Sequence, residues 1–154
     1  MELADILTRD QILAELQATD RWLAIDELVN QLVTAGKVSP ANREAIATVV
    51  KKREKTMSTG IGYGIGIPHG CTELIPEVVG VLGRSKVGIN FDSLDAQPVT
   101  LVMLFLVPQG QFQKHLHTLR DMAKYLNKAE FRQALEQAAD ADAMLKIIKE
   151  QGKK

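Results

Sequence analysis

The residues best placed to do chemistry lie in one glycine-rich stretch near the middle of the chain. Residues 60–70 read Gly-Ile-Gly-Tyr-Gly-Ile-Gly-Ile-Pro-His-Gly. Glycine weakens the interior of a strand, so its repetition indicates that another group approaches this backbone closely. His69 follows the rigid Pro68 and precedes Gly70, which predicts an imidazole presented to a partner at the end of a strand. The alternating isoleucines are expected to form one buried row: Ile61, Ile65 and Ile67.

The spacing alone leaves a simpler alternative open. A single histidine after a strand is usually a surface or capping residue, and glycine-rich loops are common in turns. No Gly-Lys-Ser/Thr follows the glycines, so the stretch is not a Walker phosphate loop. Its Gly-x-Gly-x-Gly run also lacks the spacing of the dinucleotide fingerprint. Nucleotide binding is therefore not expected.

The stretch and its flanks closely resemble the signature of the fructose/mannitol/nitrogen-type enzyme IIA domains (EIIA type-2). These domains belong to the bacterial phosphoenolpyruvate-dependent sugar phosphotransferase system (PTS). The matching parts are Arg53-Glu54, Ser58-Thr59, the run that ends in His69-Gly70, and His115-Leu116-x-x-Leu119. The resemblance covers nearly the whole chain and implies that residues 1–154 form a single PTS EIIA type-2 domain.

Two positions depart from the pattern of that family. Tyr63 stands where asparagine is common, and Gly66 stands where alanine is usual. Neither change removes a reactive group, although Tyr63 is expected to alter how a partner packs around the histidine.

The resemblance implies a phosphoryl-transfer site. His69 would be the phosphorylated nucleophile, His115 the second active-site histidine, and Arg53 the cation that faces the phosphoryl group. We expect Nε2 of His69 to attack while its Nδ1–H donates to a backbone carbonyl, since a neutral imidazole needs such an acceptor. Glu54 is expected to hold Arg53 in place. Backbone amides are expected to bind the transferred group at Gly60, Gly62 and Gly64.

Helix geometry separates two of the three histidines. At about 100° per residue, one face of the last-third helix gathers Phe112, Leu116, Leu119, Ala123 and Leu126. His115 lies near the middle of this face, whereas His117 points almost to the opposite side. Taken alone, His115 also fits a core-edge histidine that is satisfied by a backbone carbonyl. His117 is interpreted as a solvated surface residue.

The composition narrows the class of protein. The chain has 154 residues, of which 45% are apolar and 25% charged, as in ordinary globular domains. Its 19 basic and 19 acidic residues balance, which argues against a nucleic-acid partner. The longest apolar run, Val99 to Val107, is far below the roughly 20 residues of a membrane span. A single cysteine, Cys71, excludes an internal disulfide and favours the cytoplasm.

Periodicity and turn residues predict a layered α/β domain. Helices are expected over 24–35, 39–52, 112–126, 129–138 and 140–150, and strands over 78–87 and 99–107. The second strand is apolar almost throughout, which suits a strand covered on both faces. Residues 12–16 are compatible with either a strand or a helical turn. The family resemblance implies a mixed sheet flanked by helices on both faces.

The predicted function is that of a free-standing phosphoryl carrier. It would accept phosphate from an HPr-like phosphocarrier protein and pass it to an enzyme IIB, with the isoleucine row as a docking rim. No metal or cofactor is expected, because donor and acceptor are both protein side chains. The alternative is a nitrogen-type regulatory IIA protein that controls a target protein by its phosphorylation state. A third hypothesis is a metal-binding module built from His69, Cys71 and His115.

Overall fold

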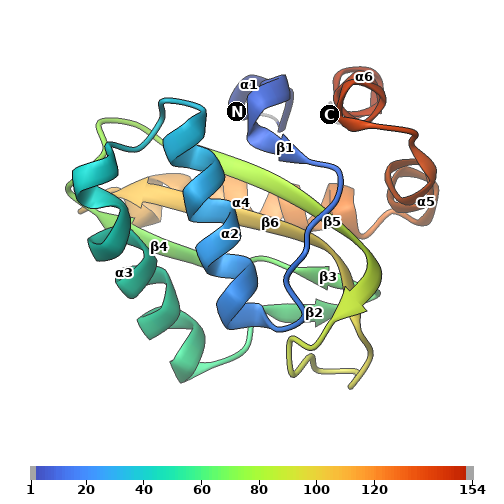
Figure 1. Ribbon diagram of the computed structural model, residues 1–154, viewed down its shortest axis with the longest axis horizontal. Helices are drawn as coiled ribbons and strands as arrows, with labels where there is room; N and C mark the ends of the chain where they lie inside the picture. The colour runs from blue at the N-terminus through green and yellow to red at the C-terminus, as the bar shows by residue number, and fades with distance from the viewer. Residues whose placement is uncertain (1–2, 152–154) are drawn as a thin grey trace.

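A mixed six-stranded sheet lies between two helical layers in the computed structural model, which describes residues 3–151 (Figure 1). The strands are β1 Ile12–Leu13, β2 Gly60–Gly62, β3 Ile65–Gly66, β4 His69–Thr72, β5 Val79–Ile89 and β6 Val99–Pro108. Their order is β1-β5-β6-β3-β2, and β4 also pairs with β6. β5 runs antiparallel to β6, whereas β3 and β4 run parallel to it.

The central strand β6 separates two hydrophobic cores. Val102, Leu104 and Leu106 belong to one core, and the alternate residues Leu101 and Met103 belong to the other. All five side chains are fully buried. Because successive side chains of a strand point to opposite faces, β6 is covered on both sides, as its apolar run predicts.

Helices cover both faces of the sheet (Figure 1). One face carries α2 Arg21–Thr34 and α3 Arg43–Thr56. The other carries α1 Leu3–Ile6, α4 Phe112–Leu126, α5 Ala129–Gln137 and α6 Ala141–Gln151. Short 3-10 turns cover η1 Arg9–Gln11 and η2 Pro40–Asn42. The expected α/β fold is confirmed, and no helix within residues 3–151 has the length and hydropathy to cross a bilayer.

Several element boundaries differ from those expected. α2 begins earlier because the Asp20 side chain caps it, accepting a hydrogen bond from Leu23 N at 2.9 Å. The helix predicted from Ser39 to Lys52 starts as a 3-10 turn and continues to Thr56. The ambiguous residues near 12 form the short strand β1, which pairs in parallel with β5.

The glycine-rich stretch folds as a small hairpin followed by a broken strand. β2 and β3 pair across a turn in which Gly62, Tyr63 and Gly64 all have positive φ. Since the chain reverses here, side-chain alternation does not continue across the turn. The expectation of one buried isoleucine row is therefore wrong: Ile65 and Ile67 are buried, but Ile61 is 38% exposed.

Pro68 interrupts the edge of the sheet between β3 and β4. Its carbonyl accepts a hydrogen bond from Phe105 N at 3.0 Å, but it has no N–H to donate. His69 is the first residue of β4 and lies opposite Phe105, so it begins a strand instead of ending one. The β6 ladder on one side and the rigid proline on the other fix the backbone of the histidine.

Candidate functional site

His69 lines a cavity of about 420 Å³ that lies between the end of α3 and the helix α4. One side is a polar wall, which we define as Arg53, Ser58 and Thr59. The opposite side is an apolar wall on α4, defined as Phe112, Leu116, Leu119 and Ala123. The remaining lining residues are Met57, Ile61, Ile67, Leu94 and Arg120.

The imidazole of His69 is held by neighbours at one ring nitrogen and on one ring face. Its Nδ1 lies 2.9 Å from the carbonyl oxygen of Ile67, and its ring stacks on Phe112 with centroids 6.2 Å apart. A carbonyl oxygen only accepts, so this contact requires the proton on Nδ1. Nε2 is then the nitrogen that carries the lone pair. The contact therefore favours the Nδ1–H tautomer, which is the one that an Nε2 nucleophile needs.

Burial lowers the pKa of His69 below its ordinary value of 6.5. The Ile67 carbonyl opposes this effect, the positive charge of Arg53 adds to it, and the negative charge of Glu54 opposes it. Burial dominates because taking the imidazolium out of water costs more than its neighbours return. The imidazole is therefore neutral at neutral pH, which keeps Nε2 available for attack.

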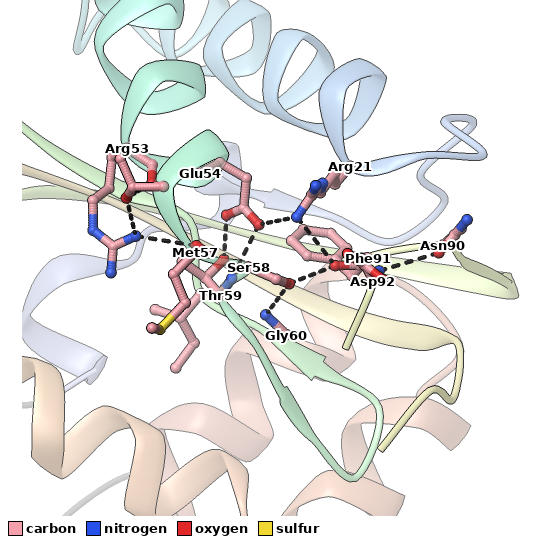
Figure 2. Close-up of polar contacts among 12 residues, drawn as sticks. Arg21, Arg53, Glu54, Met57, Ser58, Thr59, Gly60, Asn90, Phe91 and Asp92 are labelled. Carbon is pink, nitrogen blue, oxygen red and sulfur yellow. Dashed lines mark hydrogen bonds and ion pairs between the residues drawn. The ribbon is translucent and has the colours of Figure 1, made fainter. Parts of the chain in front are cut away.

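Arg53 lies in the last turn of α3, in the same cavity as His69. Its Nη1 donates to the Met57 carbonyl at 3.1 Å and to Thr56 Oγ1 at 3.4 Å (Figure 2). These contacts tie the guanidinium to the end of the helix, where a cation is favoured by the helix dipole. The structure thus brings together His69 and Arg53, two of the three residues predicted to do the chemistry.

Glu54 does not hold Arg53, contrary to the expectation from sequence. Its side chain is fully buried and accepts hydrogen bonds from Arg21 Nη1 at 3.1 Å and from Thr59 N at 3.0 Å (Figure 2). Consecutive helical residues are about 100° apart, so Arg53 faces the cavity while Glu54 faces the interior.

Sequence reasoning missed Arg21 and Thr59, although a signal for a buried partner was present. The buried face of α3 consists of Ile46, Ala47, Val50 and Glu54. A carboxylate on the apolar face of an amphipathic helix needs hydrogen-bond or charge partners, because burying it alone is costly.

The two histidines of α4 differ in burial as predicted. His115 is 8% exposed, with Nε2 3.4 Å from Gln111 Oε1, and burial lowers its pKa with help from Lys114. The His117 side chain is 73% exposed and lies 3.4 Å from an Asp121 carboxylate oxygen.

His115 is turned inward as predicted, but the expectation that it lies near the middle of the apolar stripe is wrong. The predicted apolar stripe of α4 forms the cavity wall, whereas His115 shares the adjoining buried face with Thr118 and Met122. Among the described residues that line the cavity, His115 is absent. Its role as the second active-site histidine therefore stays a prediction.

The three glycines predicted to bind the phosphoryl group shape the hairpin. Gly60 N donates to Ser58 Oγ at 3.1 Å, and a Cβ at Gly60 would overlap Ser93. Gly62 and Gly64 lie in the turn with φ of 98° and 80°. Of residues 3–151, those lining the cavity do not include these glycines. The predicted amide contacts receive no support from this geometry.

The hypothesis of a metal-binding module loses its geometric basis. Within residues 3–151 no three His, Cys, Asp or Glu side chains converge as a metal site. Cys71 is half-buried on β4, and burial raises the pKa of its thiol. A raised pKa disfavours the thiolate, which is the form that binds metals.

Comparison with known proteins assigns the family. Residues 5–151 match the family described as "Phosphoenolpyruvate-dependent sugar phosphotransferase system, EIIA 2". The chain therefore belongs to this family and is a phosphotransferase component of the EIIA type-2 class.

Relatives include both sugar-specific and regulatory proteins. The chain is 35% identical to the fructose-specific EIIABC component of Bacillus subtilis over 99% of its own length, but it spans only 24% of that protein. It is 32% identical to the nitrogen regulatory protein of Bradyrhizobium diazoefficiens, covering 96% of this chain and 95% of that protein.

Solved structures share the fold. The nitrogen regulatory protein IIA-Ntr from Neisseria meningitidis superimposes with a TM-score of 0.84 at 25% identity, covering 95% of this chain and 98% of that one. Enzyme IIA mannitol of Escherichia coli, solved in complex with phosphorylated enzyme IIB, gives 0.77 at 20% identity, covering 94% and 97%.

Proposed function

We propose that His69 accepts a phosphoryl group from an HPr-like phosphocarrier protein and passes it to an enzyme IIB. The observation that carries this proposal is the contact between His69 Nδ1 and the Ile67 carbonyl, in a cavity that also holds Arg53. The contact leaves a neutral imidazole with its lone pair on Nε2. We expect Nε2 of His69 to be the atom that accepts the phosphoryl group.

The transfer step needs an aligned nucleophile and charge neutralisation more than further covalent chemistry. Nε2 of His69 forms a bond to phosphorus while the N–P bond of the donor phosphohistidine breaks, and that electron pair returns to the donor ring. Arg53 neutralises charge on the equatorial oxygens. Its planar guanidinium suits phosphate oxygens in a way that an ammonium does not. In the second transfer a nucleophile of enzyme IIB forms a bond to phosphorus while the Nε2–P bond of His69 breaks, and that electron pair returns to the His69 ring.

Three exposed apolar side chains at the cavity form a docking rim for these partners: Met57, Ile61 and Leu94. They are 67%, 38% and 81% exposed. The isoleucine rim expected from sequence is corrected accordingly, because Ile65 is fully buried and unavailable to a partner. Enzyme IIB enters the proposal because the mannitol relative was solved in complex with its phosphorylated IIB.

The family assignment favours the sugar phosphotransferase role over the regulatory alternative. Both roles use a phosphohistidine, so they differ only in the downstream partner. The cytoplasm stays the predicted compartment, and one EIIA domain over residues 1–154 stays the predicted organisation.

Phosphate mapping tests the proposal directly. The protein is incubated with phosphoenolpyruvate, enzyme I and HPr, and acid-labile phosphate is located by peptide mapping. We expect His69→Ala to abolish acceptance while the circular dichroism spectrum stays that of the folded parent. His117→Ala is the matched control and should accept normally, because its side chain is exposed. Labelling of a folded His69→Ala protein would overturn the proposal.

A further inference from the structure

Glu54 carries a fully buried carboxylate that the transfer step itself does not use. Its exposed fraction is 1%, and it accepts three hydrogen bonds (Figure 2). Two come from Thr59, from the backbone N at 3.0 Å and from Oγ1 at 2.6 Å, and the third comes from Arg21. Three donors on one buried carboxylate fix it in place and fix the donors in turn.

The backbone of Thr59 connects this carboxylate to the histidine. The Thr59 carbonyl accepts a hydrogen bond from Ile67 N at 3.0 Å. The Ile67 carbonyl, in turn, lies 2.9 Å from His69 Nδ1. Ile67 belongs to the interruption between β3 and β4, so Thr59 supplies the backbone contact that a continuous strand would otherwise provide. A displacement of Thr59 would therefore move the acceptor of the histidine ring.

Arg21 anchors the other side of Glu54. Its guanidinium lies 4.4 Å from the centre of the Trp22 ring, and its Nη1 lies 3.5 Å from the Phe91 carbonyl oxygen. Ser58 Oγ donates to that same carbonyl and accepts from Gly60 N (Figure 2). The segment before β2 is thus held from α2, from α3 and from Phe91, which follows the end of β5.

We propose that Glu54 is a positioning residue for His69. It holds Thr59 in place, and Thr59 in turn fixes Ile67. The Ile67 carbonyl then keeps its hydrogen bond with Nδ1–H of His69, so that Nε2 stays aimed into the cavity. The inference rests on the proposed phosphoryl transfer at His69. The competing explanation is that Glu54 only stabilises the fold by pairing with Arg21. The two explanations make opposite predictions for a pair of conservative variants.

Glu54→Gln keeps the length of the side chain and loses its charge. The amide oxygen accepts from Thr59 N and Arg21 at the position of Oε2, and the amide nitrogen donates to Thr59 Oγ1, which reorients to accept. Glu54→Asp keeps the charge but withdraws the carboxylate by one methylene, so it no longer reaches Thr59. A positioning role predicts that the Gln variant keeps the parent tautomer and transfer rate better than the Asp variant. An ion-pair role predicts the reverse order.

The first readout is the tautomer of His69 without any phosphate donor, from the nitrogen chemical shifts of the imidazole in two-dimensional NMR. We expect the Nδ1–H form in the parent and in Glu54→Gln, and a mixture of tautomers in Glu54→Asp. The second readout is the single-turnover rate with phosphorylated HPr, per folded molecule. Because displacing a reacting group by about 1 Å costs up to about 100-fold, we expect Glu54→Asp to be about 10- to 100-fold slower. Glu54→Gln should stay close to the parent rate.

Glu44→Gln is the matched control on the same helix. The Glu44 side chain is 84% exposed and pairs with Arg43, so its loss should change neither readout. Parent-like tautomer and rate in folded Glu54→Asp would overturn the proposal, as would a faster Asp than Gln variant. If the parent itself is not phosphorylated on His69, the proposed function fails, and the tautomer comparison still decides the role of Glu54.

Discussion

The polar wall and the apolar wall of the cavity beside His69 are held in place by different kinds of interaction. The polar wall is fixed by hydrogen bonds, with Arg53 tied to the end of α3 and Thr59 tied to Glu54. The apolar wall is one stripe of the helix α4, and its Phe112 ring stacks on the histidine. Hydrogen bonds set positions and charge, whereas apolar contact supplies area and excludes water. We therefore assign the chemistry to the polar wall, and partner contact to the docking rim together with the apolar wall.

The largest expected effect comes from the polar wall. Removing one preorganised charge contact costs about 10²–10³ in rate, so Arg53→Ala should slow acceptance from phosphorylated HPr by that factor. Its helix-end contacts contribute only about 0.3–1 kcal/mol to folding, so the melting temperature should change little. Quenched-flow kinetics beside a thermal melt measure both quantities.

Arg53→Lys is the matched variant, and it should recover only part of the rate. Lysine keeps the charge but loses the planar fork that fits phosphate oxygens. An unchanged rate in Arg53→Ala would move the chemistry off the polar wall and return Arg53 to a helix-capping role.

The next effect separates burial from exposure on α4. We expect His115→Ala to lower the free energy of unfolding by about 1–3 kcal/mol, because it empties a buried position. It should also slow transfer if His115 acts as the second active-site histidine. His117→Ala should change stability by less than about 0.5 kcal/mol, since that side chain is exposed. Urea melts and the transfer assay on both variants give the comparison, and equal behaviour would refute the assignment of helix faces.

A smaller effect is expected from the apolar wall itself. Leu116 is half-buried, and its truncation removes contact area for a docked partner. Leu116→Ala should raise the KM for phosphorylated HPr about fivefold, equivalent to about 1 kcal/mol, with little change in kcat. Exposed Lys114 on the same helix provides a control variant, Lys114→Ala. A fall in kcat at constant KM would break the division between the walls.

The fold was predictable where one pattern determines both the element and its burial. The run from Val99 to Val107 is apolar on both alternating faces, and it forms the central strand between two cores. The hairpin was not predictable in the same way. Its alternation of isoleucines looks continuous in sequence, but three consecutive positive φ values reverse the chain and expose Ile61.

The site was predictable where a local motif carries the chemistry, and less so where partners are distant. His69 and Arg53 follow from the family signature and do share the cavity. Arg21 lies 33 residues before Glu54, and no local spacing links the two. Gly66 has a physical reason that only packing reveals, because a Cβ there would come within 2.9 Å of the buried Phe91 ring.

The smallest expected effect is a pH dependence of the histidine between the walls. Burial, with a contribution from Arg53, lowers the pKa of His69 below 6.5, so the folded protein favours the neutral ring. The nucleophilic form should then persist as the pH falls through 6.5, and acceptance should decline only below that value. The free energy of unfolding should depend on pH in the same direction. Below pH 6.5 the unfolded chain binds the proton first, so the contribution of His69 to stability is present above 6.5 and is lost as the pH falls.

Proton NMR of the His69 ring, beside the transfer rate at each pH, tests this expectation. In Arg53→Ala the titration midpoint should rise, because a neighbouring cation that disfavours protonation is gone. Leu116→Ala changes no charge, so it should raise the midpoint only by as much as it lets water reach the ring. The comparison between the walls thus separates two causes of the pKa shift of His69: Arg53→Ala tests charge, and Leu116→Ala tests burial. A parent midpoint at or above 6.5 would show that burial does not control the ring, and equal midpoints in the parent and Arg53→Ala would remove Arg53 from its electrostatic environment.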